Sequence, residues 1–244
     1  MGEIMNEKQE GERTRKGDLT RQRILESALL LFESKGYEET TMRDIAAAVG
    51  SSPGLTYRYF RSKEELVLEL YHNLCAQLEA YAHELAPGSL PERFHAMVAR
   101  QLELMAPHRA ALSALFGVTL NSRSNAGVFS EGTADIRRRG RKTYLEIILG
   151  AKDAPKKSQC EDLATVLYGM HLAMVLFWLI DESKQAGRTH LLLAFLRDLL
   201  KLMQPLLWLP PVRQTLARLV AILGPILGDG RLTMLPAEGV HDNP

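Results

Sequence analysis

Between Arg43 and Lys63 the sequence places basic side chains next to tyrosines. The residues concerned are Arg43, Tyr57, Arg58, Tyr59, Arg61 and Lys63. Guanidinium and ammonium groups bind phosphates, a guanidinium can also pair with a guanine edge, and tyrosine hydroxyls hydrogen-bond phosphate oxygens. This chemistry is that of nucleic-acid binding, provided that the local structure presents these side chains on one surface.

Two short helices are expected to present them. Thr41, followed three residues later by an aspartate, has the spacing of a capping box, and Gly50 ends the helix that this box begins. Ser52 followed by proline begins another helix, which extends to about Tyr59. Two short helices joined by a tight glycine turn form a helix-turn-helix, whose second helix fits the DNA major groove.

Longer helices are expected on either side. Apolar residues follow a helical period after Thr20, the predicted N-cap, and Gly36 ends that run. Ser62 and Glu65 have capping-box spacing and begin a long helix after the motif.

The stretch from Ile24 to about Leu70 resembles the N-terminal DNA-binding domain of TetR-type bacterial transcriptional regulators. Three segments carry the resemblance in order and at the usual distances: "ILESALLLFESKGYEETTMRDIAAAVG", "SPGLTYRYF" and "SKEEL". The resemblance implies that DNA is contacted by Thr41, Met42, Arg43, Ser52, Pro53, Gly54, Leu55, Tyr57, Tyr59 and Lys63.

Two positions depart from the family pattern. Ser51 stands where the family usually has a small branched apolar residue, and Thr56 where it usually has an inward-packing leucine or valine. We expect weaker packing at these positions and a tilt of the recognition helix.

The rest of the chain is also predicted to be helical, which makes the fold class all-α. Helical apolar periods run over 91–105, 108–120, 126–149, 161–182, 188–208 and 212–227, and no alternating strand pattern competes with them. The predicted organisation is a disordered arm (1–19), a helix-turn-helix domain (20–66), a helical ligand-binding and dimerisation domain (67–228) and an irregular tail (229–244).

The resemblance implies a homodimer that responds to a small molecule. Helices 161–182 and 188–208 are apolar nearly all round, so they are expected to pair with their two-fold mates. A lipophilic or aromatic effector would contact Met105, His108, Leu112, Phe116, Phe129, Tyr144, Ile148, Tyr168, His171, Met174 and Trp178. The alternatives are that these residues are plain core and that a protein partner controls the regulator. Helix 212–227 could cover either the dimer pair or the pocket mouth.

Other classes of protein find little support. Cys75 and Cys160 have no metal-ligand spacing, so we expect a reducing compartment and no metal site. No catalytic or phosphate-loop motif occurs, and no enzyme activity or cofactor is predicted.

The N-terminus lacks a secretory signal, and a cytoplasmic location is expected. The uncharged run 163–180 is interpreted as a buried helix with no membrane partner, and the basic run 137–142, "RRRGRK", as a solvated face.

Overall fold

The computed structural model describes residues 2–119 and 133–227, and all regular structure within them is helical, as predicted. Phe129, the beginning of the predicted helix 126–149 and the predicted tail 229–244 lie outside the described residues. The chain divides into two compact units. The first contains the described residues 2–74 and 105–119, and the second contains 75–104 and 133–227. This division differs from the predicted boundary after residue 66, because the helix that begins there continues without interruption to residue 84.

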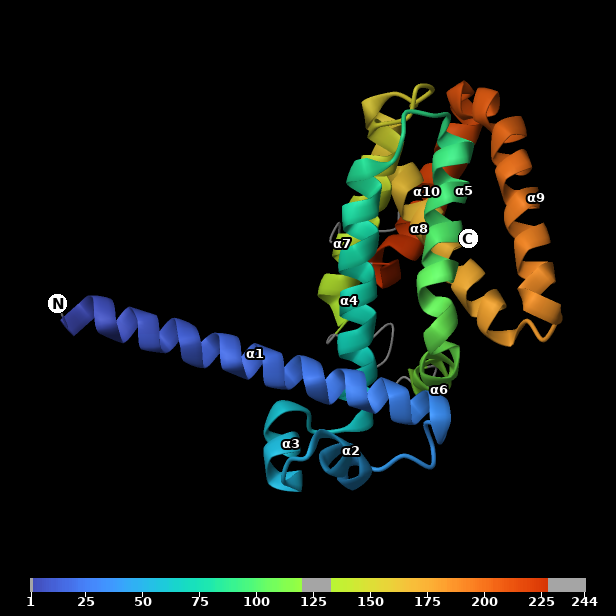
Figure 1. The fold of residues 1–244 in the computed structure, drawn as a ribbon. Helices are drawn as coiled ribbons and strands as arrows, with labels where there is room; N and C mark the ends of the chain where they lie inside the picture. Colours follow the sequence, from blue (N-terminus) through green and yellow to red (C-terminus); the bar gives the residue numbers. More distant parts are fainter. Residues whose placement is uncertain (1, 120–132, 228–244) are drawn as a thin grey trace, which may run out of the picture. The chain divides into compact units, whose positions relative to one another are not determined.

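The first unit is a helical head. Its elements are α1 (Gly2–Ser34), α2 (Met42–Val49), α3 (Pro53–Tyr59), the beginning of α4 (Lys63–Glu84), the 3-10 turn η1 (Ala106–His108) and α6 (Arg109–Thr119). The C-terminal half of α1 packs against α2, which packs against α3 (Figure 1). Ile24, Ile45 and Phe60 are fully buried and bring one apolar side chain each from α1, from α2 and from the end of α3 into the core.

Helix α1 begins much earlier than predicted. Residues 2–34 form one helix, where we expected a disordered arm over 1–19. Glu, Lys, Arg, Gln and Met dominate this stretch, and these residues favour helix interiors, so intrinsic propensity outweighs the absence of an apolar stripe. Thr20 is therefore not an N-cap; its hydroxyl donates to the Lys16 carbonyl one turn earlier, at 2.8 Å.

The caps of the helix-turn-helix form as predicted. Thr41 and Asp44 make both bonds of the capping box, and Gly50 adopts the left-handed conformation with φ of 70°. The Ser52 hydroxyl accepts the Leu55 N–H at the start of α3. The capping box expected at Ser62 is only half formed, because Glu65 accepts the backbone N–H of Arg61 at 2.6 Å and not that of Ser62.

The second unit is a bundle of longer helices. Its elements are the end of α4, α5 (Leu90–Met105), α7 (Ala134–Leu149), α8 (Lys157–Ile180), the 3-10 turn η3 (Lys184–Ala186), α9 (Gly187–Met203), the 3-10 turn η4 (Gln204–Trp208) and α10 (Pro210–Leu227). Helix α8 packs against α7, α9 and α10 (Figure 1). In the described part of the chain α8 alone is long and apolar enough to cross a membrane, but twelve of its side chains are buried within the protein, as a core helix requires.

The basic run on α7 is not a uniformly solvated face. Arg137 is only 8% exposed and donates to the Thr133 hydroxyl at 2.7 Å. Arg139 makes two hydrogen bonds to the Glu79 carboxylate, at 2.9 and 2.7 Å. Gly140 lies against Tyr168, where an added Cβ would approach the ring to 2.6 Å. The prediction of a solvated face is therefore correct for Arg138 and Lys142, which are exposed, and wrong for Arg137 and Arg139, which α7 turns toward neighbouring side chains.

Candidate nucleic-acid interface

The head exposes most of the side chains that were predicted to contact DNA. Thr41, Arg43, Ser52, Pro53, Gly54, Leu55 and Tyr57 are exposed, and Tyr59 is partly exposed. The opposite sides of the same short helices are buried, with Ile45 on α2 and Thr56 on α3 both fully enclosed. Burial of these inner faces leaves the outer faces of α2 and α3 open to a partner.

Met42 is an exception among the predicted contacts. Its side chain is 7% exposed and belongs to the core of the head. Met42 is the first residue of α2, where the periodicity that places Ile45 inward also turns residue 42 inward. The structure therefore does not support a DNA contact by the Met42 side chain.

Lys63 is engaged within the head. Its Nζ donates to the carbonyls of Tyr37 and Glu38, at 2.7 and 3.2 Å, and lies 4.4 Å from the centre of the Tyr37 ring. These contacts tie the start of α4 to the loop between α1 and α2. A phosphate contact by Lys63 would compete with two existing hydrogen bonds.

The two departures from the family pattern compensate for each other. The hydroxyls of Ser51 and Thr56 form a hydrogen bond at 3.0 Å, and Thr56 is fully buried. A buried hydroxyl is costly only when it has no partner. This pairing joins the turn to α3 and gives the buried Thr56 hydroxyl a partner.

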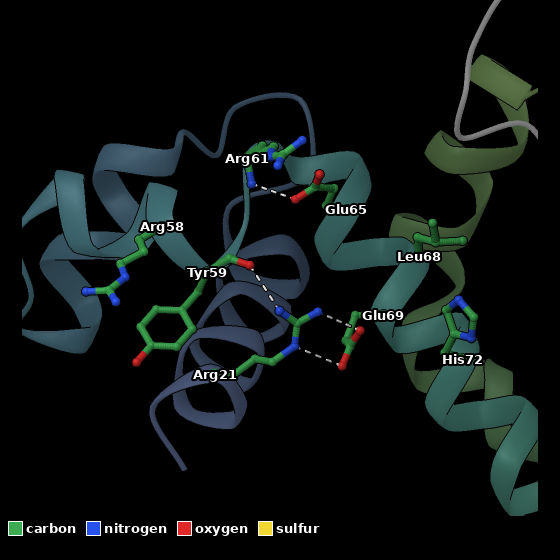
Figure 2. Close-up of a pocket in the computed structure, with 8 residues that line it drawn as sticks. All are labelled: Arg21, Arg58, Tyr59, Arg61, Glu65, Leu68, Glu69 and His72. Carbon is green, nitrogen blue, oxygen red and sulfur yellow. Dashed lines mark hydrogen bonds and ion pairs between the residues drawn. The ribbon is translucent and has the colours of Figure 1, made fainter. Parts of the chain in front are cut away.

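A polar cleft of about 490 Å³ lies along α1, α3 and α4 in the first unit (Figure 2). Its lining consists of Arg21, Arg58, Tyr59, Arg61, Glu65, Leu68, Glu69 and His72. The exposed guanidinium groups of Arg58 and Arg61 have no hydrogen bond or ion pair with the described residues, so both remain able to bind an anion.

Arg21 is the central residue of this cleft, although no sequence motif indicated it. Its Nε and one terminal nitrogen donate to the two carboxylate oxygens of Glu69, at 3.2 and 2.9 Å. Its other terminal nitrogen donates to the carbonyl of Tyr59 at 3.0 Å (Figure 2). The hydrogen bond from Arg21 lowers the pKa of Glu69, because it stabilises the ionised carboxylate. The partners are 48 positions apart, so no local sequence pattern could have identified the pair.

The residues predicted to line a ligand site are divided between the two units. Met105, His108, Leu112 and Phe116 belong to the first unit, and Tyr144, Ile148, Tyr168, His171, Met174 and Trp178 belong to the second. The expected single site is therefore not assembled within either unit.

A buried aromatic cluster forms within the second unit. The Tyr144 hydroxyl and His171 Nδ1 are 2.8 Å apart, and Tyr168 stacks on the His171 ring with an interplanar angle of 15°. Phe94, which no sequence pattern indicated, has its ring centre 6.0 Å from that of Tyr144. Burial lowers the pKa of His171 to about 3 and raises that of Tyr144, so both groups are uncharged at neutral pH.

Comparisons with known proteins agree with the helix-turn-helix. Residues 24–70 match the family model "Bacterial regulatory proteins, tetR family". The chain is 26% identical over 163 residues to the uncharacterized HTH-type transcriptional regulator YhgD of Bacillus subtilis, covering 64% of this chain and 82% of that protein. It is 33% identical over 89 residues to the HTH-type transcriptional repressor KstR2 of Mycobacterium tuberculosis, covering 36% of this chain and only 44% of the repressor.

The fold of a solved structure is also similar. A tetR-family transcriptional regulator from Streptomyces coelicolor aligns with 84% of this chain and 90% of its own, at 21% identity and a TM-score of 0.56. A helical protein with an exposed, capped helix-turn-helix belongs to the class of DNA-binding regulators. Residues 24–70 therefore carry a TetR-type helix-turn-helix, and the fold of the chain is similar to that of a TetR-family transcriptional regulator.

Proposed function

We propose that the chain is a cytoplasmic, homodimeric repressor that binds a palindromic operator and leaves it when a small lipophilic or aromatic molecule binds. The observation that carries the proposal is the capped helix-turn-helix with Thr41, Arg43 and Tyr57 exposed on it. One relative over part of the chain is named a repressor, which supports repression over activation.

The exposed side chains suggest a division of roles in DNA binding. Arg43 lies in the first turn of α2 and is long enough to reach a guanine edge. Tyr57 offers a hydroxyl to phosphate oxygens, which fix the position of the head on the duplex. The Thr41 hydroxyl would have to exchange its 2.9 Å hydrogen bond to the Asp44 carboxylate for such a contact. The residues that begin α3, Ser52, Pro53, Gly54 and Leu55, would face the groove.

The proposed dimer surface lies mainly on α9 and α10. Only Thr189 and Leu193 are buried on α9, whereas Leu191 and Phe195 are 73% and 59% exposed. Helix α8, which we expected to share the interface, is largely covered within the chain, and its most exposed large apolar residue is Ile180 at its end. Large apolar side chains exposed together on one surface favour association with a second copy.

The proposed effector is uncharged where it meets the aromatic cluster of Phe94, Tyr144, Tyr168 and His171. These groups carry no net charge at neutral pH and offer a hydroxyl and an imidazole as hydrogen-bond partners. Aromatic walls with a few polar groups are typical of sites for small apolar ligands.

A regulator controlled by a protein partner, with no small effector, is the second candidate. It is favoured by the hydrogen bond between Tyr144 and His171, which already satisfies the two groups without a ligand. Thermal unfolding with a panel of uncharged aromatic compounds discriminates between the candidates. A concentration-dependent rise in Tm together with release from DNA supports the sensor, and Tm values that stay constant across the panel support the protein-controlled regulator.

Selection of bound duplexes from a random library tests the proposed function. The salt concentration is fixed, because phosphate contacts make affinity strongly dependent on it, and the mass of the protein is measured in parallel. We expect a palindrome whose half-sites are about one helical turn, roughly 34–36 Å, or a multiple of it apart. Binding without any sequence preference would contradict the proposal.

A further inference from the structure

The recognition helix α3 is too short to hold its own orientation. It has seven residues and ends at Tyr59, and isolated helices of fewer than about 12 residues are marginal in water. The last carbonyls of a helix have no partners within it. The residue that follows α3, Phe60, is extended and is not a glycine cap. The end of α3 therefore depends on contacts from other helices.

Arg21 supplies such a contact from α1. Its guanidinium donates to the Tyr59 carbonyl and lies 4.3 Å from the centre of the buried Phe60 ring. Glu69 on α4 holds the other edge of the guanidinium through two hydrogen bonds (Figure 2). A guanidinium is a rigid planar fork, so three bonds and one ring contact fix both its position and its plane.

We propose, on the basis of the DNA-binding function above, that Arg21 is a positioning residue held by Glu69, which orients α3 for base recognition. Binding constellations work only when they are held to within about 0.5 Å and 10–20° of the productive geometry. Without the pair, the end of α3 is free to move and the base contacts are lost in part. Phosphate contacts tolerate such movement, because they do not depend on sequence.

Substitution of Glu69 tests the proposal, because it should change binding to the preferred sequence and to unrelated sequences in opposite directions. A carboxylate repels DNA, so Glu69→Gln removes an unfavourable charge and should leave binding to unrelated sequences unchanged or stronger. The same change weakens the hold on Arg21 and should weaken binding to the preferred sequence. Opposite effects on binding to the preferred sequence and to unrelated sequences cannot come from the change in charge alone.

The second unit contains a matched control pair. Arg139 and Glu79 make a bidentate pair with 2.9 and 2.7 Å bonds, and their side-chain exposures of 41% and 27% match the 41% and 28% of Arg21 and Glu69. Glu79 lies on α4 like Glu69, but the Arg139 pair has no bond to α3. Arg139→Gln therefore removes the same chemistry without touching the recognition helix.

The experiment compares the wild type, Arg21→Gln, Glu69→Gln and Arg139→Gln. Dissociation constants are measured for the duplex selected from a random library and for a scrambled duplex of equal length, and circular dichroism gives helix content and Tm. We expect the ratio of the two affinities to fall by about tenfold or more in Arg21→Gln and Glu69→Gln, because base contacts and not phosphate contacts are lost. In Arg139→Gln we expect a similar change in Tm and an unchanged ratio.

Three results would overturn the positioning role. Equal losses on both duplexes in Arg21→Gln, with a salt slope shallower by about one, would make Arg21 a direct phosphate contact. An unchanged ratio in Glu69→Gln would show that the pair does not orient α3, and this variant decides the matter if Arg21→Gln fails to fold. An equal fall of the ratio in Arg139→Gln would attribute the effect to general stability. A wild type that prefers no duplex would instead reject the proposed function.

Discussion

At the scale of single residues, Arg43 is the side chain on which we expect sequence preference to depend most. It is exposed in the first turn of α2, one residue after the buried Met42. Arg43→Ala should weaken binding to the selected duplex by about 1–3 kcal/mol and relax the preference at one base pair, since an arginine that reads a guanine edge contributes about that much. The measurement is the affinity for a set of duplexes that each change one position.

Arg213→Ala is the control for this prediction, because Arg213 is an exposed arginine on α10 in the other unit. We expect it to bind every duplex as the wild type does. If Arg43→Ala instead lost the same affinity on every duplex, Arg43 would be a phosphate contact and the base reading would belong to α3.

The family resemblance identified exposed residues of the motif, with Met42 as the exception, but not which of them are already engaged in other contacts. It implied that Thr41, Arg43 and Tyr57 contact DNA, and all three side chains are exposed. The bonds of Lys63 to the 37–38 carbonyls and of Arg21 to Glu69 join distant segments, and no local pattern encodes them. Long-range polar pairs follow from the packing of α1 against the rest of the head, which sequence periodicity does not describe.

At the scale of elements, the bond between Ser51 and Thr56 should behave as a coupled pair. Ser51→Val or Thr56→Val alone leaves the other hydroxyl without its partner near a fully buried site, and each should destabilise the protein by about 1–3 kcal/mol. The double variant removes both hydroxyls and places apolar side chains at both positions, so it should recover most of that loss. Denaturant unfolding of the four proteins gives the coupling free energy.

If the losses of stability in the two single variants add up in the double variant, the hydrogen bond between the hydroxyls contributes nothing to the placement of α3. The affinity of the same four proteins for the selected duplex separates an effect on stability from an effect on DNA recognition. If the double variant is as stable as the wild type and binds equally well, the departures from the family pattern are neutral with respect to DNA binding.

Helices were more predictable from the sequence than their ends and partners. The cores of α5, α8 and α10 were located from apolar spacing alone, and η4 follows α9 because Pro205 interrupts the regular hydrogen bonds there. The start of α1 was missed because a polar helix has no apolar stripe to reveal it. Apolar residues on all sides of α8 were interpreted as a dimer surface, whereas α7 and α10 cover most of them.

At the scale of the whole molecule, the proposed palindromic operator requires two copies of the head, and α9 offers an exposed apolar face for pairing. Leu191, Phe195 and Leu202 on α9 are 73%, 59% and 70% exposed, and Ile222 on α10 is 61% exposed. Such a surface in water favours self-association, and a two-fold axis places the same residues on both sides.

Phe195→Arg should therefore produce monomers, because two guanidinium groups would meet near the two-fold axis with little solvent to screen them. Light scattering gives the mass, and the affinity for the palindrome should fall to that for an isolated half-site, since the two heads no longer bind as one unit. Leu30→Arg is the control, because Leu30 on α1 is 66% exposed but lies outside this surface, and we expect it to remain dimeric. A dimeric Phe195→Arg protein with unchanged affinity would move the interface away from α9, and α10 would then be the surface to change next.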